Sequence, residues 1–262
     1  MNKTGRKNVC ALLFVCACLV GLALARPAHA VQIILQPGPA EGKDSRVYSG
    51  GTSGPTTNYG TSDSMQVRSK YNQRRSFIEF DLSSIPSGAT ITGADLELFR
   101  YGCDFVPGGD PPYGDGQTDV NAYRVTQAWT EGTGGTVPDP GPYDPTSPLT
   151  WLNQPAYDST VIDTALCTKA EGPVWKTWDV TGLVSDWHGG VYPNHGFALN
   201  SVDDGDWAYF YSSDYTGNEA LRPRLVVEYI PEPSTLVLGL LGTGFVGVMA
   251  RRRRLSGKPT DP

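Results

Sequence analysis

Four basic residues and one aromatic residue lie close together in the sequence, and their chemistry suits an acidic ligand. They belong to the segment "RSKYNQRR" and are Arg68, Lys70, Tyr71, Arg74 and Arg75. A guanidinium group donates two parallel hydrogen bonds to a carboxylate, so this group predicts a site for glycans that contain uronic acids. The alternative is a solvated hairpin in which the arginines pair with neighbouring acidic residues, Glu79, Asp81 or Asp95.

Aromatic side chains form a second candidate group, because an exposed ring can pack against the face of a sugar. Those on or near predicted loops are Trp151, Trp207, Tyr209 and Tyr211. Trp151 also belongs to a family motif given below, so a structural role is its alternative. The other tryptophans are expected in the core and are Trp129, Trp175, Trp178 and Trp187.

Acidic residues in two segments offer the oxygen ligands that calcium prefers. The segment "VDDGDW" contains Asp203, Asp204 and Asp206, and four more aspartates lie between positions 104 and 119. Neither segment matches the spacing of an EF-hand loop. A structural calcium is therefore one interpretation, and turns in which aspartates bond their own backbone are the other. No cofactor is required by either interpretation.

Two cysteines lie in the central part of the chain, Cys103 and Cys167. In an exported protein an even number favours a disulfide between them, and two free, buried thiols are the alternative. A zinc site is not predicted, because two cysteines without suitably spaced histidines match no zinc pattern.

Residues suited to catalysis are few. His188 and His195 are the only histidines after residue 30, and neither G-x-S-x-G nor H-E-x-x-H occurs in the sequence. Acidic residues are plentiful, but their number alone does not single out the pair that a glycosidase uses. The sequence predicts a protein that is not an enzyme, with a polysaccharide lyase or hydrolase as the alternative.

The charge of the chain argues against a nucleic-acid partner. The net charge is −6, but nine of the 21 lysines and arginines and only two of the 27 acidic residues lie in residues 1–30 and 231–262. The central residues 31–230 therefore hold 12 basic and 25 acidic side chains. A surface this acidic repels nucleic acids and anionic membranes.

The central residues have the patterns of a β protein. Alternating apolar and polar residues occur in three segments, SMQVRSKY (64–71), RSFIEFDL (75–82) and GADLELFRY (93–101). Further strands are predicted around 119–126, 161–166, 196–201, 207–212 and 224–230. Strands that each bury one face predict an all-β fold, a β-sandwich or jelly roll.

A short helix and two long loops interrupt this pattern. Helical spacing of apolar residues between Val180 and Trp187, followed by Gly189, predicts one short helix that caps the sandwich. Residues 102–119 and 131–148 are rich in glycine, proline and aspartate, and are predicted to be long loops.

Both ends of the chain have the composition of targeting signals. Residues 1–30 combine a basic start, an apolar stretch and Ala28-His29-Ala30, which predicts a signal peptide that is cleaved after Ala30. Near the other end, residues 234–250 are uncharged and span roughly 25 Å as a helix, which is enough for a short membrane segment. The positive-inside rule places the basic residues that follow in the cytoplasm, and these are Arg251, Arg252, Arg253 and Arg254.

The C-terminal arrangement resembles a PEP-CTERM sorting signal over residues 231–254, with 255–262 as a short tail. The resemblance rests on Pro231, Glu232 and Pro233, the apolar stretch and the four arginines, in that order. It implies an exosortase-type sorting enzyme as a partner and transient anchoring in the inner membrane. It also implies a place at the cell surface or outside the cell, in a Gram-negative bacterium that makes extracellular polysaccharide. A plain C-terminal membrane helix is the alternative.

The central residues 31–230 resemble a second family, the DNRLRE-type domain. The matching segments occur in the family's order and are NYGTSDSMQVRS (58–69), RRSFIEFDLSSIPSGATITGADLELF (74–99), VNAYRVTQAWTEG (120–132), LTWLNQPAYDS (149–159), WKTWDVTGLVSDWHGG (175–190), NHGFALNS (194–201) and ALRPRLVVEY (220–229). The resemblance implies a β-sandwich, and some members of the family bind polysaccharides. We therefore expect an exported surface or matrix protein that binds extracellular polysaccharide without catalysis, with anionic glycans favoured. A purely structural or adhesive protein of a biofilm matrix is the remaining alternative.

Overall fold

The computed structural model describes residues 29–70, 72–104, 116–202 and 206–232. The chain divides into two compact units, Val31–Tyr229 and a terminal unit made of Met1–Ala30 and Ile230–Pro262. Most of the predicted signal peptide, the apolar stretch 234–250 and the four arginines after it lie outside the described residues. In the parts that are described, no helix is both long and apolar enough to cross a membrane.

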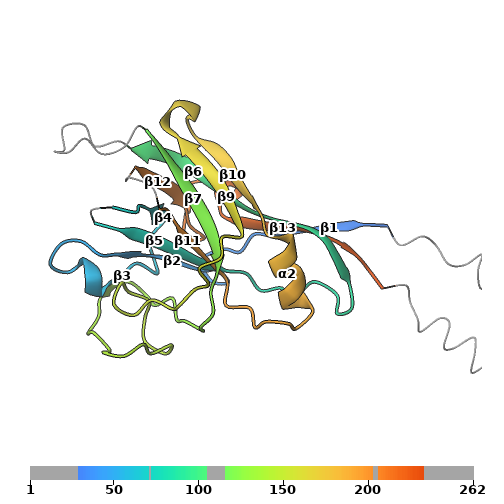
Figure 1. The fold of residues 1–262 in the computed structure, drawn as a ribbon, viewed down its shortest axis with the longest axis horizontal. Helices are drawn as coiled ribbons and strands as arrows, with labels where there is room; N and C mark the ends of the chain where they lie inside the picture. Colours follow the sequence, from blue (N-terminus) through green and yellow to red (C-terminus); the bar gives the residue numbers. More distant parts are fainter. Residues whose placement is uncertain (1–28, 71, 105–115, 203–205, 233–262) are drawn as a thin grey trace, which may run out of the picture. The chain divides into compact units, whose positions relative to one another are not determined.

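The unit Val31–Tyr229 is built mainly from two antiparallel sheets (Figure 1). Sheet A contains, in spatial order, β1 (Val31–Leu35), β13 (Arg224–Ile230), β6 (Thr90–Asp104), β12 (Trp207–Tyr211) and β4 (Ser64–Val67), and β10 (Val174–Asp179) also pairs with β6. Sheet B contains β2 (Lys43–Tyr48), β5 (Arg74–Glu79), β11 (Phe197–Asn200), β7 (Gln117–Arg124) and β9 (Asp163–Thr168). A small third sheet pairs β3 (Thr57–Asn58) with β8 (Gly135–Thr136).

The main core lies between the two sheets. Sheet A contributes Leu98 and Phe210, sheet B contributes Ile78 and Phe197, and each of these side chains is at most 1% exposed. They occupy alternate positions of their strands, because successive residues of a strand point to opposite faces of the sheet. The prediction of an all-β sandwich with one short helix is confirmed.

The outer face of sheet B is also buried, which the alternating pattern does not predict. Phe77, placed opposite Ile78 by the pattern, is fully buried in a second apolar cluster together with Trp129 and Leu149. Trp129 and Leu149 come from the long segment between β7 and β9, so this segment covers the sheet. Both faces of β5 therefore pack against other residues.

Two buried asparagines fix the segment between β7 and β9 that covers sheet B, which we call the covering segment (residues 125–162). It includes the predicted loop 131–148. The Nδ2 of Asn58 donates to the carbonyl oxygens of Glu131 (2.5 Å) and Leu149 (2.7 Å). The Nδ2 of Asn153 donates to Asp144 O at 2.9 Å, and its Oδ1 accepts from Asp144 N at 2.9 Å. These bonds satisfy backbone groups that no strand partner reaches. The other predicted loop, 102–119, lies mostly outside the described residues.

The predicted helix is confirmed as α2 (Thr181–His188). Its buried residues are Leu183, Val184 and Trp187, which join the core between the sheets. The Trp187 ring meets the Phe197 ring edge to face, with centroids 4.8 Å apart. The helix ends at Gly189, whose N–H donates to Ser185 O.

The structure corrects the predicted disulfide, because Cys103 and Cys167 are buried thiols that are not joined to each other. The Cys103 thiol contacts the backbone of Cys167 and lies 3.8 Å from its carbonyl oxygen. Burial raises the pKa of Cys167 to about 12, which keeps this thiol neutral and unreactive. The alternative of two buried thiols is the one that the structure has.

Candidate functional site

The outer face of sheet A holds a row of aromatic side chains, which we call the aromatic strip. In the β12 sequence "WAYFY", Ala208 and Phe210 point into the core, so the residues between them point outward. The same alternation on β6 and β10 brings further rings to this face. The strip consists of Phe99, Tyr101, Trp175, Trp207, Tyr209, Tyr211 and Tyr215.

The rings follow one another across strands β10, β6 and β12. From Trp175 the strip passes to Phe99 (centroids 5.5 Å apart) and to Tyr211 (6.0 Å). It then continues to Tyr101 (4.6 Å), Tyr209 (5.8 Å) and Trp207 (5.6 Å). Each ring of the strip that a strand presents is half-buried, so one side is held by the sheet while the other stays accessible.

The middle of the strip presents ring edges and hydroxyl groups. Tyr211 stacks on Tyr101 at 4.6 Å and on Tyr215 at 3.6 Å, with interplanar angles of 20° and 10°. A hydrogen bond with Tyr215 raises the pKa of Tyr211 to about 12, so its hydroxyl stays protonated. Tyr209 lies against Gly102, where an added Cβ would sit 3.4 Å from its ring. The strip therefore offers apolar edges beside neutral hydroxyls.

Arginines lie at both ends of the strip. The Arg68 and Arg74 guanidinium carbons lie 4.5 Å and 4.0 Å from the centre of the Trp207 ring. Backbone hydrogen bonds in both directions between Arg68 and Arg74, each 3.0 Å, bring these residues side by side. At the other end, Arg224 lies 4.3 Å from the Trp175 ring and pairs with Glu97 at 2.5 Å.

Arg46 of β2 reaches the same edge of sheet A as Arg74. Its Nη1 donates to Ser62 Oγ (2.5 Å) and to Ser64 O (2.6 Å), and its guanidinium lies 4.3 Å from the Tyr59 ring. Ser64 pairs with Tyr211 across β4 and β12, so Arg46 adjoins the strip. Arg74 in turn lies over the Tyr48 ring at 4.2 Å.

Arg46 and Arg74 are desolvated cations without a carboxylate partner. Within the described residues, neither makes an ion pair, and their polar partners are serine, asparagine and tyrosine groups. Burial lowers the pKa of both guanidinium groups, and the charge of Arg74 lowers that of Arg46 further. The charge of Asp63 raises the pKa of Arg46 but offsets the lowering only in part. An anionic group placed here would relieve this unbalanced positive charge.

The structure divides the predicted basic group into two. Arg68 and Arg74 meet at Trp207, but Arg75 points to the opposite face of β5, because consecutive strand residues alternate. Arg75 lies 4.7 Å from the Trp151 ring and donates to Gln154 Oε1 at 2.7 Å. The four basic residues of the predicted group therefore do not form one site. Lys70 is exposed, and the predicted residue Tyr71 lies outside the described residues.

The other predicted positions have mixed outcomes. Trp207 and Tyr209 belong to the strip, whereas Trp151 lies beside Arg75, away from it. Trp175 is not a core residue as expected, because it is half-buried on the outer face of sheet A. The predicted core positions are confirmed for the remaining tryptophans, which are Trp129, Trp178 and Trp187.

Asp206 has a structural role in the described residues. It is 1% exposed, and its Oδ2 accepts from the backbone N–H groups of Gly116 (2.6 Å) and Gln117 (2.8 Å). This carboxylate therefore fixes the start of β7. The predicted calcium ligands Asp203 and Asp204 lie outside the described residues.

A shallow hollow beside α2 is lined by acidic residues that suit catalysis poorly. Asp158 and Asp179 both line it, with Arg124 and Tyr192. Hydrogen bonds from Thr160 lower the pKa of Asp158, and hydrogen bonds from Thr181 lower that of Asp179. Both carboxylates are thus held ionised, whereas a general acid needs a raised pKa. The arginine of the hollow pairs with Asp158 at 3.0 Å.

Several residues of the strip, and several at the edge beside it, were not predicted from the sequence. Phe99 and Tyr101 alternate with buried residues of β6, a period-2 signal that is visible in the sequence. Arg46, Tyr48 and Tyr59 had no such signal, because only the approach of β2 to β4 brings them to this edge.

The outer face of sheet A thus displays aromatic rings, which can pack against sugar faces, and arginines, which can pair with acidic groups. The family model of carbohydrate-binding module family 96 matches residues 40–136 and 145–229. The chain belongs to this family. None of the curated proteins compared matches the chain.

A second match covers the C-terminal residues. The model of the PEP-CTERM protein-sorting motif matches residues 230–254, which confirms the resemblance seen in the sequence. This motif marks an exported protein that is sorted to the cell surface, and it implies recognition by an exosortase-type enzyme. Both families expected from the sequence, a polysaccharide-binding type of domain and the sorting signal, are thus shown.

Proposed function

We propose that the protein is a non-catalytic module of the cell surface that binds an anionic extracellular polysaccharide along the aromatic strip. The observation that carries the proposal is the placement of Arg46 and Arg74. Both are half-buried cations without a carboxylate partner in the described residues, beside rings that sugars can pack against. In a domain that is acidic as a whole, such cations are suited to a uronic-acid carboxylate.

The shape of the strip supports a polymer rather than a small molecule as the ligand. The rings run across three neighbouring strands in successive steps of 4.6–6.0 Å. Neutral tyrosine hydroxyls along the way can exchange hydrogen bonds with sugar hydroxyls. The sugar units would contact ring edges and hydroxyls in the middle, and guanidinium groups at the end near Trp207.

The ends of the chain support an external location for this binding. We propose that residues 1–30 are removed on export and that residues 231–254 direct the protein to its sorting enzyme, with a transient membrane helix. Residues 31–230 then form the mature binding domain in an extracellular matrix such as a biofilm.

Affinity electrophoresis tests the proposal with two adjacent arginines as a matched pair. The protein runs through native gels that contain either a polyuronate or a neutral polysaccharide, with EDTA throughout. We expect polyuronate to retard the parent, and Arg74→Gln to weaken binding by roughly 10-fold or more, because a charge-assisted hydrogen bond contributes about 1.5–3 kcal/mol.

The control is Arg75→Gln, which removes an arginine that also lies over a tryptophan, but on the opposite face of β5. It should bind like the parent. Equal retardation of all three proteins would place the glycan elsewhere, and no retardation of the parent by any glycan would overturn the proposal.

A further inference from the structure

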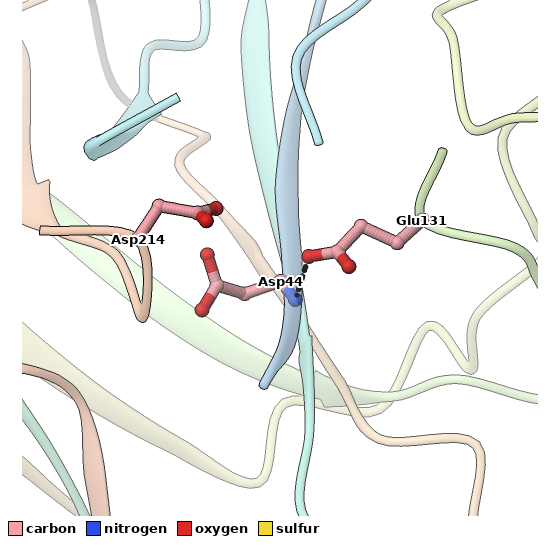
Figure 2. Close-up of side chains that lie close together, drawn as sticks. All are labelled: Asp44, Glu131 and Asp214. Atoms are coloured by element: carbon pink, nitrogen blue, oxygen red, sulfur yellow. Dashed lines mark hydrogen bonds between the residues drawn. The ribbon is translucent and has the colours of Figure 1, made fainter. Parts of the chain in front are cut away.

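Three carboxylates from distant parts of the sequence meet at one edge of the sandwich (Figure 2). Asp44 belongs to β2, Glu131 to the segment that covers sheet B, and Asp214 to the connection that follows β12. One oxygen from each lies within 4.8 Å of the others. Figure 2 shows the Asp44 carboxylate turned toward Asp214, while Glu131 reaches the backbone of β2.

Asp44 is buried and only partly hydrogen-bonded. The residue is 2% exposed, and its Oδ2 accepts from the Ser213 backbone N–H at 2.8 Å. Its Oδ1 has no hydrogen-bond partner in the described residues. A buried carboxylate oxygen without a partner is costly, so it points to a ligand that the protein chain itself does not supply.

The basic residues nearby are occupied by other carboxylates. Lys43 pairs with Glu79 at 2.6 Å, and Arg222 pairs with Glu219 at 3.4 Å. Glu131 takes a hydrogen bond of 2.7 Å from the Asp44 backbone N–H, which orients it but adds no full charge. The charges of Lys43 and Arg222 still lower the pKa of Glu131 and of Asp214 respectively, so they offset the negative charge of the cluster only in part.

Burial raises the pKa of Asp44 to about 7 and that of Glu131 to about 8, and it also raises the pKa of Asp214. Repulsion by Asp214 adds to the shift of Asp44, repulsion by Asp44 and Asp214 adds to that of Glu131, and Asp63 adds to that of Asp214.

We propose that Asp44, Glu131 and Asp214 form a calcium site. Two oxygens bound to one Ca²⁺ at roughly 2.4 Å can be at most about 4.8 Å apart, and all three carboxylates meet this limit. Carboxylate oxygens are the hard donors that Ca²⁺ prefers, and water and backbone oxygens complete its coordination. The ion would link β2, the covering segment and the connection after β12.

The site differs from the one predicted at Asp203, Asp204 and Asp206, and it does not depend on the proposed glycan binding. It has a structural consequence for the strip, since Asp214 directly precedes Tyr215, which stacks on Tyr211. Calcium at Asp214 would hold this connection in place and so stabilise one part of the strip.

The test measures calcium directly and through stability. The protein is stripped with EDTA and titrated with CaCl2 at pH 8 by calorimetry, and its unfolding midpoint is recorded with and without Ca²⁺. We expect one bound ion per chain and an increase of roughly 5–10 °C in the midpoint when Ca²⁺ is about a hundred times its Kd. Because binding displaces protons, the affinity at pH 6 should be at least about 10-fold lower than at pH 8.

Two variants locate the ion. Asp214→Asn and Glu131→Gln each change a half-buried ligand and should abolish the calcium-dependent increase. Asp186→Asn, which changes a half-buried acid on α2, should retain it. If one ligand variant fails to fold, the Ca²⁺ response of the other decides instead. No bound Ca²⁺ on the parent, or an unchanged Ca²⁺ response of both ligand variants, overturns the proposal.

Discussion

Replacing Asp44 by asparagine is expected to stabilise the cation-free protein at pH 8, although it removes a buried polar charge. The pKa of Asp44 rises from 3.8 to about 7 on folding, because burial disfavours the ionised form. The folded protein therefore holds the proton more tightly than the unfolded chain does. The associated stability is fully present below about pH 4 and is lost as the pH rises through about 7. Asparagine does not titrate, so the variant avoids this loss.

The magnitude follows from the shift. A change of about three pKa units at about 1.4 kcal/mol each gives an upper limit of about 4 kcal/mol for this single group. About 1.6 kcal/mol of this is already lost at pH 5, because the unfolded carboxyl is ionised there, and relaxation of the folded state lowers the remainder. We therefore expect a loss of about 1–2.5 kcal/mol between pH 5 and pH 8. Glu131 and Asp214 are half-exposed, and water screens their contribution. The asparagine side chain of the Asp44→Asn variant retains an acceptor for the Ser213 N–H and gains a donor toward the neighbouring carboxylates.

Urea unfolding in EDTA at pH 5 and pH 8 measures this effect. The parent should lose stability between the two values, and Asp44→Asn should lose at least about 1 kcal/mol less. Asp186→Asn provides the control for removing an acid outside the cluster, and its pH dependence should follow that of the parent. If Asp44→Asn were as pH-dependent as the parent, or less stable than the parent at pH 8, the account of a buried, repelling carboxylate would be refuted.

Three further predictions concern the strip, the backbone and the thiols. Trp207→Ala should weaken polyuronate binding by roughly 10-fold or more, because the ring orders two guanidinium groups; unchanged affinity in calorimetry would contradict this. Gly196→Ala should cost more than about 2 kcal/mol in urea unfolding, since its φ is 81° and an added Cβ would lie 2.2 Å from a backbone carbonyl oxygen. Gly135→Ala, with a φ of 91° but open space around it, should cost clearly less. In residues 31–230, Cys103 and Cys167 should give two thiols per molecule in denaturant and react slowly when folded; a single slow phase of disulfide reduction would contradict the absence of a bond between them.

Much of the fold could be predicted because the inner faces of the strands obey a simple alternation. Leu96 and Leu98 on β6, and Ile78 on β5, are buried where the period-2 pattern places them. The pattern failed at Phe77, because a segment far along the chain covers that face of sheet B. Alternation within one strand has no information about such a cover.

The site was predictable only in part, for a similar reason. Trp207 and Tyr209 could be found because one strand presents them together. Arg75 was wrongly grouped with Arg74, since closeness in sequence hides the fact that adjacent strand residues point to opposite faces. The meeting of Asp44 with Glu131 depends on tertiary packing between distant segments, and no local spacing reports it.

Hydroxyl-radical footprinting of the protein with and without a polyuronate tests the central claim most directly, because oxidation of each aromatic ring reports its own accessibility. The account predicts that bound polyuronate protects Trp175, Trp207 and Tyr209 on the strip, and leaves Trp151, on the opposite side of β5, unchanged. Protection of Trp151 alone, or a bound glycan that protects no ring of the strip, would contradict the assignment of the outer face of sheet A as the glycan-binding surface.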